Sequence, residues 1–245
     1  VYVLEANPRA SRTVPLVSKV CNIRMVPLAT DIITSELTGR PSPVPMLKEQ
    51  SIPYYGVKEA VFPFNMFPEV DPLLGPEMRS TGEVLGLSTY YGEAFYKAQE
   101  ATQTSLPLSG TVLISVNRKD KDEVVEIGKL FHECGFKILA TEGTCRLINE
   151  AGIPAERVNK LQEGRPNILD LITNGKIDLI VNSPVGKDSA HDDSYLRKAA
   201  IKAKIPYMTT IAAARATAKG IRYVKEHGNG EVKSLQQLHS EITDK

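Results

Sequence analysis

The pattern of apolar and polar positions divides this chain of 245 residues into two parts with different textures. After Gly110, short apolar and β-branched runs alternate with segments that carry one apolar face. The runs predict strands at 111–116, 136–140, 157–159, 177–181 and 207–209. The segments between and after them predict helices at 121–134, 144–151, 168–173, 193–203 and 212–226. Because such alternation is typical of a parallel sheet with helices on both faces, we predict an α/β fold with a doubly wound parallel sheet.

The part before Gly110 is patterned less regularly. It predicts strands at 1–6 and 55–62 and helices at 13–21, 27–38 and 89–101. Residues 63–86 are rich in proline and glycine, which predicts a long loop without regular structure. The polar stretch 102–110 is typical of a linker. We therefore predict two domains, an α+β fragment at 1–104 and the wound sheet at 105–245.

Composition and charge narrow the class of protein. A hydrophobic content of 42% and a charged content of 24% are ordinary for a soluble globular protein. The formal charge of +1 argues against a nucleic-acid partner held by bulk electrostatics. No apolar run approaches about 18 residues and no signal peptide opens the chain, so we expect neither a membrane span nor export.

The cysteines and the first residue add two expectations. Cys21, Cys134 and Cys145 are odd in number and widely spaced, so we expect reduced thiols in a cytoplasmic protein. The first residue is Val1 rather than methionine, although the first segment already carries the most polar motif. We therefore expect the natural polypeptide to continue upstream or to have been cut there.

That polar motif follows the first predicted strand and offers ligands for a metal and a phosphate. Glu5 and Asn7 are two apart, so a strand points both side chains the same way, and their oxygens suit Mg²⁺. Arg9 and Arg12 in the following turn can bind phosphate oxygens bidentately. The alternative is a surface turn whose charges pair with one another.

Polar residues also follow the strands predicted in the second part, and ligands of wound sheets bind beyond the carboxyl ends of the strands. Thr141 and Thr144 place hydroxyls and backbone N–H groups at a helix N-terminus, which favours an anion. The other residues at this edge are Ser115, Lys121, Lys160 and Asn182. The set predicts a site for a small phosphorylated molecule. The alternative is that the threonines only cap their helix and Lys160 is solvated.

Four stretches of the chain resemble the carboxyl-terminal part of the large subunit of carbamoyl-phosphate synthase. They are Glu5-Ala-Asn7-Pro-Arg9-Ala-Ser-Arg12-Thr-Val-Pro, Pro53-Tyr-Tyr-Gly-Val-Lys58-Glu59, Phe62-Pro-Phe-Asn-Met-Phe67 and Asp71-Pro-Leu-Leu-Gly-Pro-Glu-Met-Arg-Ser-Thr-Gly-Glu83. The first part resembles the end of the second ATP-grasp unit, which makes carbamoyl phosphate. From Gly110 onward the chain is similar to the allosteric domain, whose fold is methylglyoxal-synthase-like.

The resemblance implies an ATP-dependent ligase that makes carbamoyl phosphate from bicarbonate, ammonia from glutamine, and ATP, for pyrimidine and arginine biosynthesis. Glu5 and Asn7 match the ligands of Mg²⁺ or Mn²⁺, and Arg9 and Arg12 match the arginines that face the transferred phosphate. The implied partner is the glutamine amidotransferase small subunit. Other parts of the ATP site would lie upstream of Val1, so we expect the isolated chain to be inactive as a synthase.

The resemblance also implies two effector sites. A nucleoside monophosphate, UMP or IMP, would bind at Ser115, Lys121, Thr141, Thr144, Lys160 and Asn182. Ornithine would bind at Glu59, with Thr209 a further member of that site. Where the family often has a hydroxyl two residues after the asparagine, this chain has Pro184, which leaves the preferred nucleotide open.

Two other functions stay open from the sequence. The chain could act as a nucleotide-binding regulatory module by itself. The second part could also be a methylglyoxal synthase, which needs a carboxylate base in the loop before the motif at 175–178. The matching position is Arg165, which is always charged and cannot take a proton, although Glu163 is close by.

Overall fold

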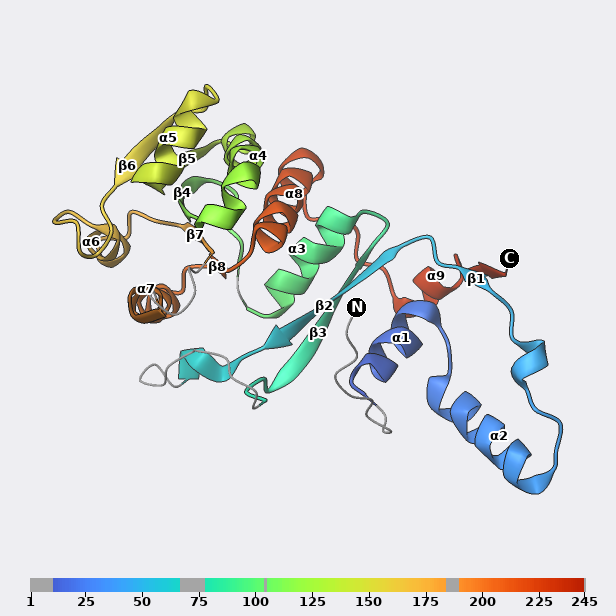
Figure 1. Ribbon diagram of the computed structural model, residues 1–245. Coiled ribbons are helices and arrows are strands. Elements are labelled where there is room, and N and C mark those ends of the chain that lie inside the picture. The colour runs from blue at the N-terminus through green and yellow to red at the C-terminus, as the bar shows by residue number, and fades with distance from the viewer. Residues whose placement is uncertain (1–10, 67–77, 104, 184–189, 245) are drawn as a thin grey trace.

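The computed structural model describes residues 11–66, 78–103, 105–183 and 190–244. Figure 1 shows two parts joined side by side, with a larger sheet and its helices in one and a two-stranded hairpin with α1 and α2 in the other. In the described residues, no helix is both long and apolar enough to cross a membrane. Cys134 and Cys145 are buried free thiols, and Cys21 is a partly buried one.

The larger sheet has five parallel strands in the order β6-β5-β4-β7-β8. These strands are β4 (Gly110–Ser115), β5 (Phe136–Thr141), β6 (Ala155–Val158), β7 (Leu179–Asn182) and β8 (Tyr207–Met208). The central strand β4 comes first in the sequence among these five. The later strands β5 and β6 extend the sheet on one side of it and β7 and β8 on the other, so the winding direction reverses at β4. The carboxyl ends of β4, β5 and β7 therefore meet at one edge, where wound sheets bind ligands.

Helices cover both faces of this sheet, as Figure 1 shows. They are α4 (Lys121–Glu133), α5 (Glu142–Glu150) and α8 (Ile211–His227) on one face, and α6 (Ile168–Thr173) and α7 (Ala190–Lys202) on the other. Adjacent residues of β4 serve the two cores: Val112 and Ile114 pack with Phe131 of α4, whereas Leu113 packs against α6 and α7. This arrangement confirms the predicted doubly wound parallel sheet.

The first part contains α1 (Thr13–Cys21), α2 (Met25–Thr38), two short 3₁₀ turns at Val44–Met46 and Pro63–Met66, and a hairpin. The hairpin consists of β2 (Tyr55–Val61) and β3 (Gly82–Ser88), paired antiparallel from Tyr55↔Ser88 to Val61↔Gly82. The prediction of a loop through residue 86 was wrong at β3. Glycines in this segment suggested a loop, whereas the backbone is held by its pairing with β2.

Position 86 of β3 has to be glycine, because helix α3 (Tyr91–Ala101) packs directly on the strand there. A Cβ at residue 86 would collide with the backbone of Ala94 and Ala98. The other side of α3 packs on α8, where Gly92 and Gly220 meet, and a Cβ at Gly220 would be 3.0 Å from the Gly92 carbonyl oxygen. Missing side chains therefore let the hairpin, α3 and α8 stack closely, which joins the two parts of the chain.

We expect Gly86→Ala to lower the free energy of unfolding by about 2 kcal/mol, because the added methyl group overpacks a rigid backbone contact. Gly82→Ala is the matched control, since a Cβ at this position of the same strand meets nothing within 4 Å. Chemical denaturation of both variants measures the difference. Equal stabilities would mean that α3 does not approach β3 as closely as described.

Glu93 of α3 links four segments although only 5% of the residue is exposed. It accepts hydrogen bonds from the hydroxyls of Ser88 and Tyr223, and Lys97 Nζ lies 2.6 Å from its Oε1. A Cβ at Gly230 would collide with the same carboxylate, so the chain after α8 also packs on it. Burial opposes the ionisation of Glu93, but the bonds from Lys97 and Ser88 and the charge of Lys97 outweigh it and lower its pKa.

The end of the chain returns to the first part. Helix α9 (Leu235–His239) contacts α1, and β9 (Thr243–Asp244) pairs antiparallel with β1 (Gln50–Ser51). His239 Nε2 lies 2.6 Å from the Lys19 carbonyl oxygen. The pattern did not predict β1, α9 or β9, because each is only two to five residues long. The domain boundary at 104/105 stays a prediction, and this pairing crosses it.

Candidate functional site

Three of the predicted effector residues lie at the reversal point of the larger sheet. Ser115 ends β4, Thr141 ends β5 and Asn182 ends β7. Ser115 pairs in register with Asn182, and the Thr141 hydroxyl lies 3.4 Å from the Ser115 hydroxyl. Thr141 and Asn182 are buried, so the sheet holds their polar groups in fixed positions.

Lys121 lies beside the N-terminus of α5. If Gly143, in the first turn of α5, carried a Cβ, this atom would be 2.9 Å from Lys121 Nζ. The Thr141 side chain does not cap the helix, and no carboxylate of the described residues pairs with Lys121. An ammonium group therefore lies next to the positive end of a helix dipole. This arrangement is repulsive by itself and attractive once an anion binds between them.

Thr144 is in the same turn of α5 and is only 1% exposed. Lys160 follows the edge strand β6 and is exposed, and its backbone N–H donates to Glu163 at 3.0 Å. The contacts of the described residues do not join the Lys160 side chain to the other five. The structure thus gathers Ser115, Thr141, Thr144, Lys121 and Asn182, and leaves Lys160 at the margin. Pro184 lies outside the described residues.

Two further residues lie at this edge: Asn117, which sequence reasoning missed, and Ser183, which follows the predicted strand at 177–181 but was not assigned to the site. The Asn117 side chain accepts hydrogen bonds from the backbone N–H groups of Lys119 and Asp120, and its Nδ2 lies 3.2 Å from Ser183 Oγ. Ser183 is buried and also accepts from the Asn117 backbone N–H at 3.0 Å. These bonds position the segment that leads into Lys121. The sequence carried a signal for both residues, because Ser183 directly follows the end of β7 and Asn117 lies two residues after the end of β4.

A second site is a cavity of about 570 Å³ between the two parts of the chain. Its lining includes Glu59 of β2 and Gln99 of α3 from the first part, and Arg197 of α7 and Thr209 from the second part. Its apolar wall includes Phe95 and the stacked rings of Phe62 and Phe64. Both residues predicted for ornithine, Glu59 and Thr209, therefore line one cavity.

Among the described residues of the lining, Glu59 is the carboxylate. Burial raises its pKa, while hydrogen bonds from the Ala60 backbone N–H and from Gln99 Nε2 work in the opposite direction. The Gln99 bond is 3.0 Å long. The partners of Glu59 among the described residues, Gln99 and the Ala60 backbone, are neutral, so an added cation would stabilise its charged form.

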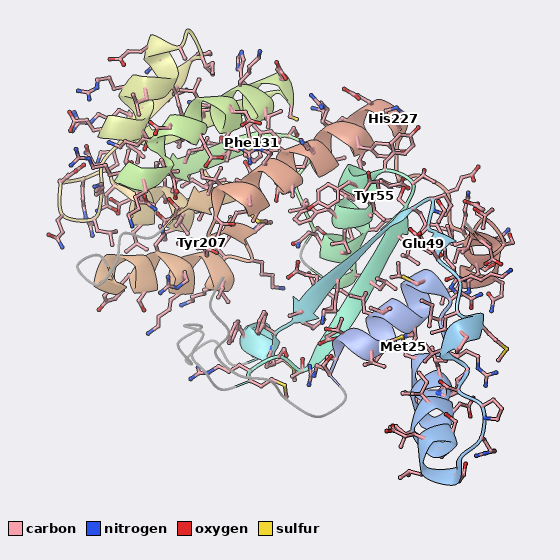
Figure 2. The ribbon with its side chains drawn as sticks, turned by 45° about the vertical axis from the view of Figure 1, so that its right-hand side comes forward. Met25, Glu49, Tyr55, Phe131, Tyr207 and His227 are labelled. Carbon is pink, nitrogen blue, oxygen red and sulfur yellow. The ribbon has the colours of Figure 1, made fainter. Side chains whose placement is uncertain are left out.

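One hydrogen bond joins the sheet edge to the cavity. Asn182 Nδ2 donates to the hydroxyl oxygen of Tyr207 at 2.6 Å, and Tyr207 lines the cavity from β8. Figure 2 shows Tyr207 next to α7. The amide at the sheet edge and the aromatic wall of the cavity are therefore in direct contact.

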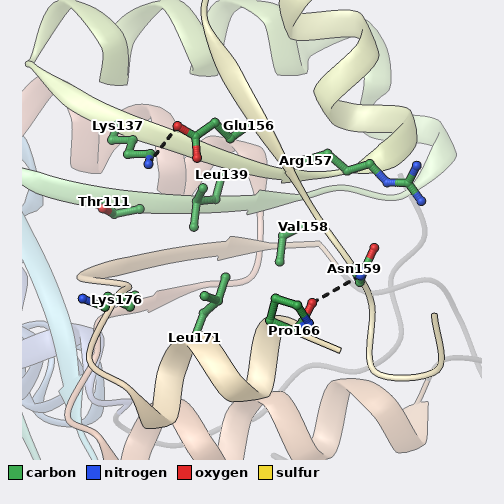
Figure 3. A pocket seen from close by; sticks show the side chains of 10 residues that line it. All are labelled: Thr111, Lys137, Leu139, Glu156, Arg157, Val158, Asn159, Pro166, Leu171 and Lys176. Atoms are coloured by element: carbon green, nitrogen blue, oxygen red, sulfur yellow. Dashed lines mark hydrogen bonds and ion pairs between the residues drawn. The ribbon is translucent and has the colours of Figure 1, made fainter. Parts of the chain in front are cut away.

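A third hollow, of about 730 Å³, lies between the β5–β6 side of the sheet and α6. Figure 3 shows its apolar floor of Leu139, Val158 and Leu171 and the ion pair of Lys137 with Glu156, 2.8 Å long. Its lining does not include the residues predicted for the effector. We therefore assign no ligand to this hollow.

The amino-terminal motif is described only at its end. Glu5, Asn7 and Arg9 lie outside the described residues. Arg12 is half exposed, with Nη1 3.5 Å from Glu83 Oε1 and 3.4 Å from Ser80 Oγ. Within the described ranges, no group of three or more His, Cys, Asp or Glu residues is placed to hold a metal. The fit of a metal to Glu5 and Asn7 stays a prediction.

Arg165 occupies the position expected for the base of a methylglyoxal synthase. Its guanidinium is exposed, 3.8 Å from Asp170 Oδ1. The nearby Glu163 accepts the backbone N–H of Lys160 and so closes its own turn. Neither contact prepares a base for proton abstraction.

The reversed strand order, with helices on both faces of the sheet, defines a doubly wound α/β domain. Residues 123–209 match the family described as MGS-like domain. Over nearly its whole length the chain is homologous to the large chain of carbamoyl phosphate synthase, which confirms the resemblance seen in the sequence.

Two curated relatives illustrate this homology. The carbamoyl phosphate synthase large chain of Acidobacterium capsulatum is 47% identical over 243 residues, covering 98% of this chain and 22% of the relative. The relative from Methanopyrus kandleri, a carbamoyl phosphate synthase large chain, C-terminal section, is 49% identical and is covered to 44%. The chain thus spans about a fifth of the first and less than half of the second.

Among solved structures, methylglyoxal synthase from Elizabethkingia anophelis is similar with a TM-score of 0.39 and 20% identity, over 46% of this chain and 79% of that one. The fold rests on the order and direction of the strands themselves.

Proposed function

We propose that this chain is the carboxyl-terminal part of a carbamoyl-phosphate synthase large subunit and that its second part is the regulatory domain. Its ligand at the sheet edge is a nucleoside monophosphate, UMP or IMP, held by its phosphate. The observation that carries the proposal is the ammonium group of Lys121 beside the N-terminus of α5. Two positive groups with no anion between them are suited to a phosphate.

Neighbouring residues support a phosphate at this place. The hydroxyls of Ser115 and Thr141 at the strand ends, and of Thr144 in the first turn of α5, are donors at the same edge. Phosphate oxygens accept several hydrogen bonds at once, so fixed donors around one helix N-terminus bind without a large ordering cost. Asn182 and Lys160 lie on either side and are the candidates for contacts with the rest of the nucleotide.

Isothermal titration with UMP and with IMP tests this site. Thr144→Val is expected to weaken binding roughly tenfold, about 1–1.5 kcal/mol, because a buried hydroxyl donor to the phosphate is lost. Thr144→Ser, which keeps the hydroxyl, should stay close to the original affinity. No heat with either nucleotide, at concentrations well above micromolar, would reject the proposal.

The proposed parent enzyme is an ATP-dependent ligase that uses glutamine-derived ammonia, bicarbonate and ATP, and works with a glutamine amidotransferase small subunit in pyrimidine and arginine biosynthesis. Glu5 and Asn7 would hold Mg²⁺ or Mn²⁺, and Arg9 and Arg12 would face the transferred phosphate. Phosphoryl transfer depends mainly on positioning and charge neutralisation, which suits these groups. We expect the 245-residue chain alone to show no ATP-dependent turnover of carbamate.

In the same proposal, ornithine occupies the cavity between the two parts. Glu59 supplies the carboxylate for an amine, and Thr209 lines the same cavity. The Asn182–Tyr207 hydrogen bond gives a physical route between ornithine and the nucleotide, because each ligand would touch one of its two residues. A regulatory module that binds nucleotide without a synthase remains the alternative.

Methylglyoxal synthase activity is less favoured. An always-charged guanidinium at Arg165 cannot abstract a proton, and Glu163 is engaged by the Lys160 backbone. A phosphate-release assay with dihydroxyacetone phosphate distinguishes the two functions, and measurable release would favour the enzyme.

A further inference from the structure

Asn117 links the segment after β7 to the residue directly before Lys121. Its side-chain Nδ2 donates to Ser183 Oγ at 3.2 Å and to Asp120 Oδ2 at 2.8 Å. Its backbone N–H donates to the same Ser183 oxygen at 3.0 Å. Ser183 is buried, and its own N–H donates to the Ser115 carbonyl oxygen at 3.0 Å, which fixes it on the sheet. One amide therefore bridges the end of the sheet and the start of α4.

The other atom of this amide shapes the turn before α4. Asn117 Oδ1 accepts the backbone N–H groups of Lys119 at 2.7 Å and of Asp120 at 3.2 Å. It thus caps the 3₁₀ turn Arg118–Asp120. Lys121 is the first residue of α4 and follows that turn directly. The Asn117 side chain therefore sets where the backbone of Lys121 lies.

The position of this backbone matters because a lysine side chain is long and flexible. The ammonium group lies beside Gly143 in the first turn of α5, next to the positive end of the helix dipole. Without an anion, that repulsion favours other side-chain orientations. Ordering a rotamer-rich side chain costs affinity, and a backbone held at the correct distance reduces the cost.

We infer that Asn117 is a positioning residue for phosphate binding, which acts through Lys121 and does not touch the ligand. The inference rests on the proposed nucleotide site and adds the residue that holds its cation in place. The contact with Ser183 keeps the turn against the end of β7. Asn182, the residue before Ser183, is a candidate contact for the rest of the nucleotide. The same amide therefore holds together the groups that meet the two ends of the ligand.

The test is a double-mutant cycle. Isothermal titration measures the affinities for UMP and IMP of the unaltered chain, Asn117→Ser, Lys121→Gln and the double variant. Serine keeps an oxygen that can cap the turn but removes both Nδ2 bonds, so the link is cut while the turn is retained. If Asn117 acts through Lys121, its replacement matters only while the ammonium group is present. Thermal unfolding verifies each variant, and Asn117→Thr, another capping residue, takes the place of serine if that variant is unfolded.

We expect Asn117→Ser to weaken binding about fivefold in the unaltered chain and less than about twofold in the Lys121→Gln background. Equal losses in the two backgrounds, or no loss in the unaltered chain, would overturn the role of Asn117 and leave the nucleotide site standing. Absence of binding of either nucleotide to the unaltered chain would overturn both.

Asn149→Ser is the matched control. Asn149 lies at the other end of α5 and also uses its amide to hold a strand, since it accepts the Ala155 N–H at 2.9 Å and donates to the Ala155 carbonyl oxygen at 3.0 Å. Losing these bonds should lower the unfolding temperature and leave the nucleotide affinity within about twofold. A loss of affinity as large as that of Asn117→Ser would trace the effect to general loosening of the domain and would also overturn the role of Asn117.

Discussion

Replacing Glu93 with alanine is expected to lower the free energy of unfolding by about 3 kcal/mol, at the low end for breaking a buried ion pair because Lys97 remains partly exposed. The change leaves the Ser88 and Tyr223 hydroxyls without their shared acceptor and opens a gap beneath Gly230. It also loosens the contact between α3 and α8. The measurement is a denaturant titration that follows both parts of the chain.

The pH dependence of the same experiment has a defined sign. The pKa of Glu93 is lowered in the folded chain, so its contribution is present above the pKa of the unfolded state and is lost as pH falls through the folded value. Glu93→Gln should therefore lose less stability than the unaltered chain on acidification. Glu226→Ala, an exposed change on α8, is the control and should change stability little. A comparable loss there would argue against a special role for Glu93.

Reversing the charge at Lys121 should abolish most nucleotide binding. Lys121→Glu is expected to weaken UMP or IMP by more than roughly 100-fold, about 2.7 kcal/mol, because an attraction to phosphate becomes a repulsion. Folding should be spared, since residue 121 opens α4 and a carboxylate is favourable at a helix N-terminus. Calorimetric titration of the variant provides the measurement.

Lys119→Glu is the matched control for that experiment. It makes the same charge change two residues earlier, at an exposed position in the turn before α4. It should reduce binding only through the weak, salt-screened field of a surface charge. If both variants lose the same affinity, the ammonium group of Lys121 is not in contact with the phosphate.

The second part of the chain was predictable because its pattern is strong. Apolar strands and one-sided helices alternate there, and the helix at 168–173 was confirmed at both ends. The first part was harder to predict. Strand β3 has glycines at 82 and 86 whose roles depend on neighbours, and α9 and β9 are held by residues about 190 or more positions away.

The candidate sites were predictable only for residues that directly follow a predicted strand. Ser115, Thr141 and Asn182 follow strands, and parallel pairing brings such residues together. Tyr207 gave no such signal, because its importance depends on its hydrogen bond with Asn182 and on its place in the cavity lining. Lys160 followed a strand end too, yet its side chain remains exposed. The difference lies in the register of the strands. Thr141 pairs with Val158, so Lys160 lies two residues beyond the position of β6 that is level with the site.

The pairing of β1 with β9 has a consequence for how the chain folds. Ser51 meets Thr243, so closing this contact requires almost the whole polypeptide to be ordered in between. Contacts between remote residues carry a high loop-closure cost and slow the folding reaction. With only two residues in each strand, the pair is also weakly held. It should form late, open early, and exchange its amide hydrogens well before the central sheet does.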